Sequence, residues 1–388
     1  KIQMIKMLTA FTEEIDDAET AVAEILDQLD LDNNLLANSV GILHCSCDFD
    51  ESSVVKDLCS SLPFDVVGST SLSVQVHGIM SQLALTLSVL TSDDVRFVSG
   101  VSDAISDDMC GPVAEVYERV IGSQAEKPAL IMPFIPFMPV IGGDEFIEKI
   151  NELSGRAIPA FGTLAITSEE DFSRVYTIYN GELYPASLVL LGLIGDVNPL
   201  FFSASVVENN ILKQKAVVTD VQKNVLKTVN NMTAVKYLES IGLVSGGKVS
   251  SFEAMPFVVK LEDGSLLTRA CISSTPDEEI ILCGSIPAGA TLAVATMGYD
   301  DIISSTGGKV QEALEKSQGR NILIYSCVAR NWTLGTKVMA EHEEVGKCIG
   351  DAVPFHFAYS GGEIFPAFFK DGSVSNQLQN DTMILCVL

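Results

Sequence analysis

The chain has 388 residues, of which 47% are hydrophobic and 19% charged, with a mean hydropathy of +0.31. This composition is typical of a folded globular protein, and the length predicts about two to three domains. The 24 Lys and Arg against 51 Asp and Glu give a net charge of −27. Such an acidic chain is not expected to bind DNA, RNA or anionic membranes, because phosphate recognition needs clustered lysine and arginine.

Hydropathy and cysteine usage predict a cytoplasmic protein. No stretch of the sequence reaches the roughly 18 consecutive apolar residues that a membrane-spanning helix needs, so we expect no membrane insertion. Glu13 and Glu14 interrupt the first apolar run too early for a signal peptide. The nine cysteines contain no Cys-x-x-Cys pair, which favours free thiols in a reducing compartment.

Three segments of the chain follow the same order of short apolar runs and amphipathic stretches. The expected elements are strands at 4–11, 40–47 and 66–70 with helices at 15–31 and 52–62; strands at 95–101, 129–134 and 160–163 with helices at 112–121 and 144–153; and strands at 292–297, 322–327 and 358–361 with helices at 309–316 and 336–345. Each segment is followed by a pair of runs, at 73–90, 174–194 and 364–388. Asn180-Gly181 and Asp371-Gly372 have the chemistry of hairpin turns.

Strands that alternate with helices predict βαβ units with parallel strand pairs. The fold class is therefore α/β, with repeated βαβαβ-plus-hairpin units that form mixed sheets in two associated domains. Laying residues 42–43 on 322–323 aligns Cys47 with Cys327. The same alignment predicts that Leu43, Leu130 and Leu323 overlap when the units are superposed.

Residues 200–290 do not follow this order. Strands are expected at 201–207 and 215–219, and helices at 220–230 and 233–241. Five lysines gather here, and they form either a solvated face or a docking surface for an acidic partner: Lys213, Lys215, Lys223, Lys227 and Lys236. The chain is expected to divide near this point into domains 1–230 and 231–388.

Polar side chains at the predicted strand ends of the third segment suggest a ligand site, because open parallel sheets bind ligands beyond the carboxyl ends of their strands. Arg330 can present a planar fork to a carboxylate, and Glu363 can receive an amine. Together they could bracket a zwitterion. The alternative is a salt bridge between Arg330 and Glu363.

Motifs in the last third of the chain resemble the C-terminal sensory domain of the FIST (F-box and intracellular signal transduction) family. Residues 325–330 form a strand that ends in Ser-Cys-x-x-Arg, residues 360–364 contain a Gly-Glu step, and residues 380–382 are a late Asn-x-Thr. Upstream, residues 66–70 are similar to the Val-x-Gly-x-Ser-Thr step of the N-terminal FIST domain. Ser71-Leu72-Ser73 departs from that family's usual continuation. The resemblance covers nearly the whole chain in the right order.

The resemblance implies a sensory protein for a small ligand, with amino acids or related carboxylates as the expected class. We recognise no output domain in the sequence, so the protein is expected to act through a separate signalling partner. We expect no enzyme activity. The residues expected to bind the ligand are Cys327, Arg330, Tyr359, Ser360, Gly361, Glu363, Asn380 and Thr382.

Two alternatives stay open. One branch of the FIST family binds haem and senses nitric oxide; His356 is the best axial candidate here, with His44 expected in the core and His77 and His342 facing solvent. Otherwise no cofactor or metal is expected. A cysteine-dependent enzyme is the second alternative, but His44 and Cys45 are neighbours on a strand and point to opposite faces.

Overall fold

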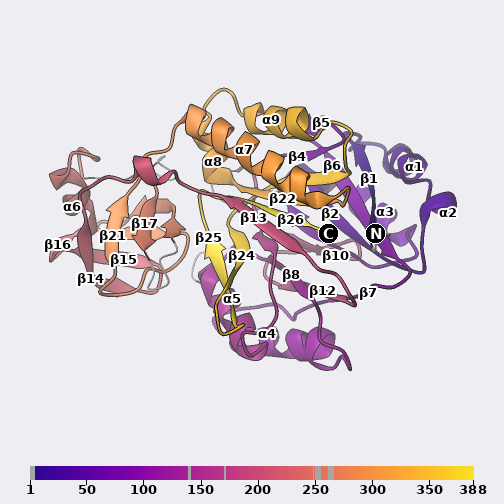
Figure 1. Cartoon of the computed structure of the whole chain (residues 1–388), viewed down its shortest axis with the longest axis horizontal. Coiled ribbons are helices and arrows are strands. Elements are labelled where there is room, and N and C mark those ends of the chain that lie inside the picture. Colours follow the sequence, from indigo (N-terminus) through magenta and orange to yellow (C-terminus); the bar gives the residue numbers. More distant parts are fainter. Residues whose placement is uncertain (1–4, 139–140, 170–171, 248, 250–254, 261–265) are drawn as a thin grey trace.

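Three six-stranded mixed sheets form the body of the protein, and a fourth sheet of eight short strands lies beside them (Figure 1). The computed structural model describes residues 5–138, 141–169, 172–247, 249, 255–260 and 266–388. In spatial order, the first sheet contains β1 (Lys6–Thr12), β6 (Leu85–Ser92), β2 (Asn38–Cys45), β3 (Val66–Thr70), β10 (Thr177–Tyr179) and β11 (Glu182–Tyr184). The second contains β25 (Val374–Gln379), β24 (Glu363–Phe368), β9 (Gly162–Leu164), β8 (Leu130–Ile135), β12 (Val189–Ile194) and β7 (Arg96–Val101). The third contains β13 (Leu200–Ala204), β26 (Met383–Val387), β22 (Ile322–Cys327), β23 (Phe355–Ser360), β4 (Val74–Val76) and β5 (Ile79–Ser81).

The three repeats exchange their hairpins in a closed cycle. In each sheet, four adjacent strands come from one repeat. The two strands at one edge come from the hairpin of another repeat. The β4–β5 hairpin of the first repeat pairs with β23, the β10–β11 hairpin of the second pairs with β3, and the β24–β25 hairpin of the third pairs with β9. The predicted repeat of strand–helix units with hairpins is therefore confirmed, and the exchange ties the three units into one body. The first strand expected for the third unit, at 292–297, is wrong, because residues 291–294 pair within the fourth sheet. Its place beside β26 is taken by β13, which the sequence put outside the repeat.

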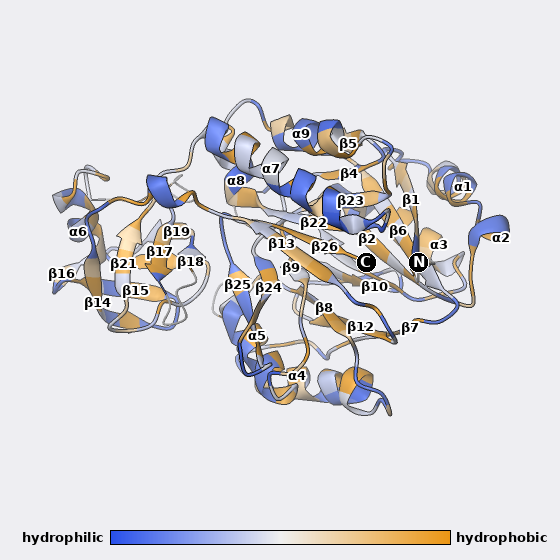
Figure 2. Ribbon diagram, in the orientation of Figure 1, coloured by the Kyte–Doolittle hydropathy of each residue, from blue (hydrophilic) through white to orange (hydrophobic). Residues whose placement is uncertain are grey.

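Helices cover the outer face of each sheet, and the inner faces of all three sheets share one core. The covering helices are α1 (Ala18–Leu29) and α3 (Val54–Ser60) on the first sheet, α4 (Cys110–Tyr117) and α5 (Gly143–Leu153) on the second, and α7 (Tyr299–Ser317) and α9 (Ala340–Ile349) on the third. Short helices at α2 (Leu31–Asn34), η1 (Cys47–Glu51), η2 (Glu118–Gly122) and α8 (Val328–Thr333) complete the body. Figure 2 shows apolar strands inside and hydrophilic turns on the outer sides of α1, α7 and α9. None of the helices in the described ranges is long and apolar enough to cross a membrane.

The overlap predicted for the three leucines is wrong. The strand pairings make His44, Phe134 and Tyr325 equivalent, and Leu43, Leu130 and Leu323 stand one, four and two residues before these positions. Leu43 lies on the outer face beneath α1 and α3, whereas Leu130 and Leu323 lie in the shared inner core. Side chains alternate between faces of a strand, so a shift of one residue exchanges the two sides. The strand pairings make His44 equivalent to Tyr325, and Ser46 rather than Cys47 then corresponds to Cys327.

The fourth sheet belongs to a separate β domain, the insertion domain, which the chain forms between β13 and α7. Its members are β18 (Leu266–Arg269), β17 (Phe257–Lys260), β21 (Thr291–Val294), β14 (Ala216–Gln222), β15 (Val225–Val229), β20 (Ile280–Leu282), β19 (Cys271–Ser274) and β16 (Met232–Thr233), with η3 (Glu208–Asn210) before the sheet and α6 (Ala234–Ser240) within the domain.

Within the insertion domain, one helix expected from the sequence is wrong and one is confirmed. Residues 220–230 form most of the β14–β15 hairpin instead of a helix, because their valines pair with the strands on either side. The expected helix at 233–241 is α6. The division of the chain at residue 230 stays a prediction; Asn230 lies in the turn between β15 and β16.

Candidate functional site

Most of the residues expected to bind a ligand meet where the strands of the third repeat end. Cys327 ends β22, Ser360 ends β23 and Glu363 begins β24, while Asn380 and Thr382 lie in the turn before β26; all five are buried. The backbone N–H of Cys327 donates to Thr382 O at 2.9 Å. Gly361 and Gly362 form the turn from β23 to β24, and a Cβ on Gly362 would lie 3.2 Å from Asn380 Nδ2. The sequence therefore brings these groups to one strand-end site.

The centre of this site is an acidic cluster of Glu363, Asp381 and the amide of Asn380. Both carboxylate oxygens of Glu363, Oδ2 of Asp381 and Nδ2 of Asn380 are buried and make no hydrogen bond of normal geometry with the described residues. The Ser360 hydroxyl and the Thr382 backbone N–H lie close enough to Glu363 to lower its pKa, but they do not offset burial. Burial, followed by the nearby Asp381 carboxylate, raises the pKa of Glu363 well above its usual value. Burial also raises the pKa of Asp381 to about 7. Buried polar groups are nearly always satisfied in folded proteins, so four such atoms together point to a missing partner.

The guanidinium of Arg330 is not free to bind a ligand at the acidic cluster. Its guanidinium is fully buried and donates to Glu341 Oε1 from Nη2 at 2.7 Å and from Nε at 3.0 Å. The salt bridge between Arg330 and Glu363 is therefore wrong, since Glu341 is the partner. Glu341 also accepts hydrogen bonds from Ser326 Oγ at 2.8 Å and from Tyr359 Oη at 2.9 Å. Tyr359 thus belongs to this ion-pair network.

Glu341 is the residue that sequence reasoning missed. It lies in an acidic stretch of α9 that reads as a solvated face, although Glu341 and Val345 are one helical turn apart and both buried. Burial raises the pKa of Glu341, but Arg330 and the hydroxyl donors outweigh burial, and its pKa is lowered overall. The carboxylate therefore stays ionised in the core.

The insertion domain covers the acidic cluster. Thr268 Oγ1 donates to Asn380 O, and Arg269 Nη1 donates to Leu378 O at 2.7 Å. Cys283 packs in one small buried group with Cys327. Burial raises the pKa of the Cys327 thiol well above its usual value, so the sulfur stays protonated and is a poor nucleophile.

A second contact holds the insertion domain to the body. The backbone N–H of Ser285 donates to Asp144 Oδ2 at 3.0 Å, and its hydroxyl donates to the same oxygen. Arg269 Nε donates to Ser285 O at 2.8 Å, which links this contact to the edge that covers the acidic cluster. Hydrogen bonds from Thr268, Arg269 and Ser285 therefore hold the insertion domain against the body beside the acidic cluster.

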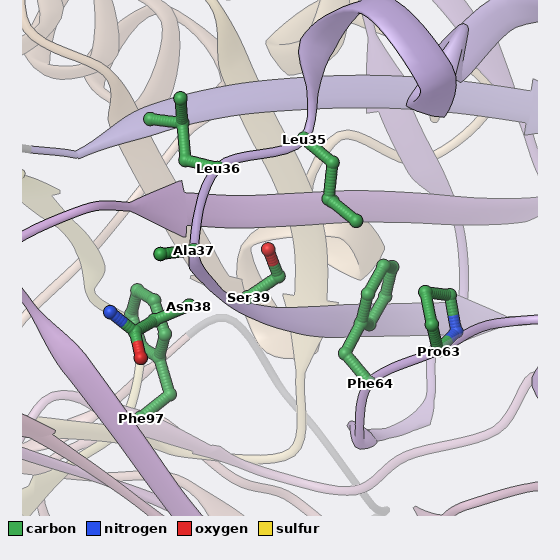
Figure 3. A pocket seen from close by; sticks show the side chains of 8 residues that line it. All are labelled: Leu35, Leu36, Ala37, Asn38, Ser39, Pro63, Phe64 and Phe97. Carbon is green, nitrogen blue, oxygen red and sulfur yellow. The ribbon is translucent and has the colours of Figure 1, made fainter.

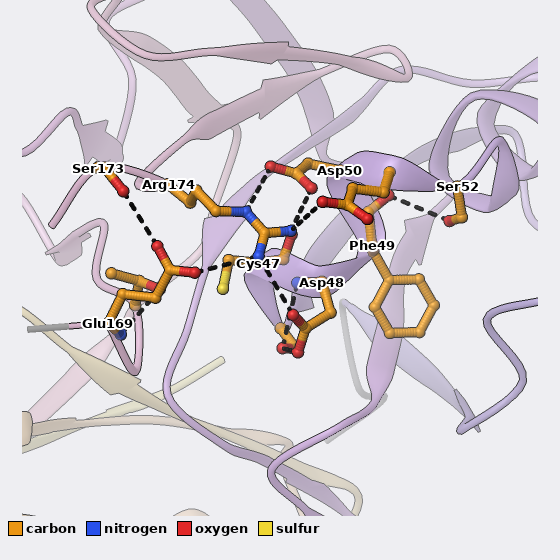
Figure 4. A network of polar contacts seen from close by, with 11 residues as sticks. Cys47, Asp48, Phe49, Asp50, Ser52, Glu169, Ser173 and Arg174 are labelled. Carbon is orange, nitrogen blue, oxygen red and sulfur yellow. Dashed lines mark hydrogen bonds and ion pairs between the residues drawn. The ribbon is translucent and has the colours of Figure 1, made fainter.

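The acidic residues that follow β2 provide a contrast, because Arg174 forms ion pairs with them (Figure 4). Arg174 pairs with Asp50 through two nitrogens, with Asp48 Oδ1 at 3.3 Å and with Glu169 Oε1 at 3.1 Å. The hydrogen bond from Arg174 lowers the pKa of Asp50. In the part of the chain that the structure describes, no lysine or arginine forms an ion pair with Glu363 or Asp381, and the nearby Arg330 is held by Glu341.

Three of the four histidines are buried. His44 lies in the core as expected, but His342 is also buried, where a solvent-facing side chain was expected. His342 follows the inner face of α9, three and seven residues before Val345 and Ile349, and its Nε2 lies 2.8 Å from Ser73 Oγ. His77 is exposed, in the turn after β4.

His356 does not fit an axial haem ligand. Its Nδ1 lies 2.7 Å from Ser88 Oγ and its Nε2 lies 2.8 Å from His44 Nδ1, so both ring nitrogens are engaged. The ring is packed against His44 inside the shared core. No group of three or more potential ligands within the described residues could hold a metal ion.

Comparisons with known proteins identify the family. A model of the FIST N domain matches residues 39–232, and a model of the FIST C domain matches residues 234–366. No curated protein matches the chain. A solved structure described as "Structure of PurLQS from Thermotoga maritima" is 10% identical, with 98% of this chain and 72% of that chain covered, and its TM-score is only 0.21. The two domain models together span most of the sequence, and the chain belongs to the FIST family.

Proposed function

We propose that this FIST protein is a sensory module that binds a small ligand with a protonated amine at the acidic cluster, without turnover, and acts through a separate output partner. FIST domains are associated with small-ligand sensing in signal transduction. The observation that carries the proposal is the set of three buried carboxylate oxygens, two on Glu363 and one on Asp381, that make no hydrogen bond of normal geometry with the described residues. A cytoplasmic location stays a prediction.

The chemistry of the acidic cluster favours a cation over an anion. An ammonium group has three donors and no acceptor, which matches the carboxylate oxygens of Glu363 and Asp381. A ligand carboxylate would have to compete for both arginines near the site, because Glu341 holds Arg330 and backbone carbonyls hold Arg269. Amino acids stay within the proposed class through their ammonium group, whereas simple carboxylic acids do not.

Ligand binding should release protons. Without a ligand, burial raises the pKa values of both carboxyls, and Asp381, with a pKa of about 7, is about half protonated at neutral pH. A cation favours the ionised carboxylates and lowers their pKa values. We therefore expect the affinity to rise with pH between about 5 and 8, as fewer protons have to be displaced.

The signal would arise from movement of the insertion domain. The acidic cluster is fully buried, so a ligand can enter only if the edge that carries Thr268 and Arg269 separates from β25. A bound ligand would then change how that edge closes. In this proposal, ligand binding changes the position of the insertion domain directly, and no other part of the chain has to move.

The test is a thermal-shift screen of amino acids, alkylamines and the matching carboxylic acids, followed by calorimetry of any hit. An amine hit should bind at least about tenfold more weakly to Glu363→Gln, because a charge-assisted hydrogen bond is lost. The exposed Glu343→Gln, from α9, is the matched control and should bind as the wild type does. Stabilisation by carboxylic acids alone, or equal binding by Glu363→Gln, would refute the amine site.

A further inference from the structure

The carboxylates of the acidic cluster are not a common feature of the three repeats. The strand pairings place Thr177 and Val74 at the positions of the other repeats that correspond to Glu363. By the backbone hydrogen bonds that precede β6 and β26, the counterpart of Asp381 in the first repeat is Leu83, which is 62% exposed. The same backbone forms without these carboxylates, which favours a role in binding for them rather than a role in the fold.

Small side chains from both domains adjoin the acidic cluster. Four of them pack in one buried group, which we call the small-residue wall: Cys327 and Ala329 of the body, and Ala270 and Cys283 of the insertion domain. The backbone N–H of Ala270 donates to Asn380 Oδ1 at 3.4 Å. This hydrogen bond places the wall beside the amide whose Nδ2 belongs to the cluster.

The carboxylates lie near a thiol from each domain. Burial, and after it the carboxylates of Glu363 and Asp381, raises the pKa of the Cys327 thiol. Burial and the same two carboxylates also raise the pKa of the Cys283 thiol. Protonated thiols are small and only weakly polar. This side of the cluster therefore offers a ligand neither a charge nor a strong hydrogen-bond acceptor.

The acidic cluster is tightly enclosed. Its three polar residues are at most 1% exposed. On the body side, a Cβ on Gly362 would lie 2.9 Å from Leu378 Cδ1. On the side of the insertion domain, a Cβ on Gly284 would lie 2.9 Å from Arg269 Nε. The backbone of both domains is thus close-packed beside the cluster, and only a small ligand fits there while the domains are closed.

An open hollow on the first repeat has the opposite geometry (Figure 3). It has a volume of about 440 Å³, Leu35 and Phe64 line it, and Leu36 beside them is 37% exposed. A ligand of any length could extend from such a hollow into solvent. A ligand at the acidic cluster could not, because the edge that carries Thr268 and Arg269 covers it.

The donors and the space available define the ligand. Three carboxylate oxygens, two on Glu363 and one on Asp381, match the three N–H donors of a primary ammonium group. The fourth substituent on the nitrogen must then fit against the small-residue wall. We propose that the ligand is an ammonium ion that carries no substituent larger than a methyl group, and that the small-residue wall sets this limit. The inference rests on the proposed amine site and narrows it, because a longer substituent would keep the insertion domain from closing.

The probes are the chlorides of ammonium, methylammonium, propylammonium, tetramethylammonium and potassium, together with the free amino acid glycine. Each is titrated into the full chain by calorimetry at pH 7.5 and constant ionic strength. We expect ammonium and methylammonium to bind, and propylammonium and glycine to bind at least about tenfold more weakly, because added atoms do not fit. Tetramethylammonium and potassium have no N–H donor, so neither should bind.

Two variants enlarge the space at the wall. Ala270→Gly removes a methyl group, and its matched control is Ala216→Gly, a buried alanine of the insertion domain in β14. Cys283→Ala removes a sulfur, and its control is the buried Cys386→Ala in β26. Each wall variant should raise the affinity for propylammonium relative to methylammonium by about tenfold. Both controls should keep the ratio of the wild type, which a general loss of stability would not change.

The possible failures can be told apart. Equal affinities for methylammonium and propylammonium in the wild type would overturn the size limit while leaving the amine site in place. Binding of none of the amines would refute the amine site and this inference with it. Potassium binding as tightly as ammonium would show that the cluster recognises charge and not N–H donors. An unchanged affinity ratio in both wall variants would show that the wall does not set the limit.

Discussion

His44 and His356, 312 residues apart in the sequence, share a hydrogen bond of 2.8 Å between Nδ1 and Nε2 at the point where the three sheets meet. Ser88 Oγ lies 2.7 Å from His356 Nδ1, while His44 Nε2 has no partner among the described residues. The position of His44 is filled by Phe134 in the second repeat and by Tyr325 in the third, and His44 packs against both rings. A polar pair therefore replaces apolar packing in one of three equivalent places.

This histidine pair should make the protein sensitive to acid. Burial lowers the pKa of His44 well below its usual value and that of His356 to about 3. Below pH 6.5 the two histidines bind protons in the unfolded chain but not in the folded chain. The free energy of unfolding therefore falls as the pH decreases from 6.5 toward 3. At pH 5 the loss is about 2 kcal/mol for each histidine.

The test replaces both residues by those at equivalent positions, as His44→Phe/His356→Val. Urea unfolding at pH 7.5 and 5 should show a smaller loss of stability for this variant than for the wild type. Exposed His77→Gln is the control and should keep the wild-type difference. If the double variant loses as much stability in acid as the wild type, the histidine pair is not the cause.

The buried ion pair of Arg330 and Glu341 gives a second prediction. Arg330→Met leaves an ionised carboxylate in the core, and the free energy of unfolding should fall by about 3–5 kcal/mol. Adding Glu341→Gln removes that charge while keeping an acceptor for Ser326 and Tyr359, so part of the loss should return. Lys347→Met breaks a pair whose lysine is 78% exposed and should cost only about 0–1 kcal/mol. If the double variant lost the sum of the unfolding free energies lost by the two single variants, Arg330 and Glu341 would not be energetically coupled.

The repeated fold could be predicted from the sequence because strand and helix patterns are local. The exchange of hairpins could not, since nothing in β4 or β24 tells which sheet edge each will join. In the site, the positions of Cys327, Glu363 and Asn380 could be predicted, because ligand-binding residues are expected where strands end. The partner of Arg330 could not be predicted. Glu341 reaches Arg330 only through the packing of α9 on the third sheet, which local sequence patterns do not encode.

Asp381 should destabilise the ligand-free protein at high pH. Its pKa is raised from 3.8 to about 7, so the folded state favours the protonated carboxyl. The associated stability is present below pH 4 and is lost as the pH rises through 7, by up to about 4 kcal/mol. Asp381→Asn keeps a side chain that tolerates the left-handed backbone at φ 52. Its melting temperature should exceed that of the wild type at pH 8 but not at pH 4, whereas exposed Asp351→Asn should change neither value.

The last prediction concerns the close approach of parallel strands in the first repeat. A Cβ on Gly68 would lie 1.7 Å from Leu43 O, and one on the equivalent Gly162 would lie 2.1 Å from Pro133 O. The third repeat has Phe357 at this position, so only the first two require glycine. Because Leu43 O and Pro133 O are backbone atoms of central strands, neither strand can move without disturbing its sheet.

Gly68→Ala should therefore lower the free energy of unfolding by more than about 2 kcal/mol, through a forced shift of β3 away from β2. The control is Gly308→Ala in α7, where a Cβ meets open space. That change should raise stability by about 0.5–1 kcal/mol, since alanine is the better helix former. Chemical denaturation measures both variants. A stable Gly68→Ala would mean that β2 and β3 can separate locally, and the core at His44, which pairs with Ser69 one residue further on, would then be less rigid than its packing implies.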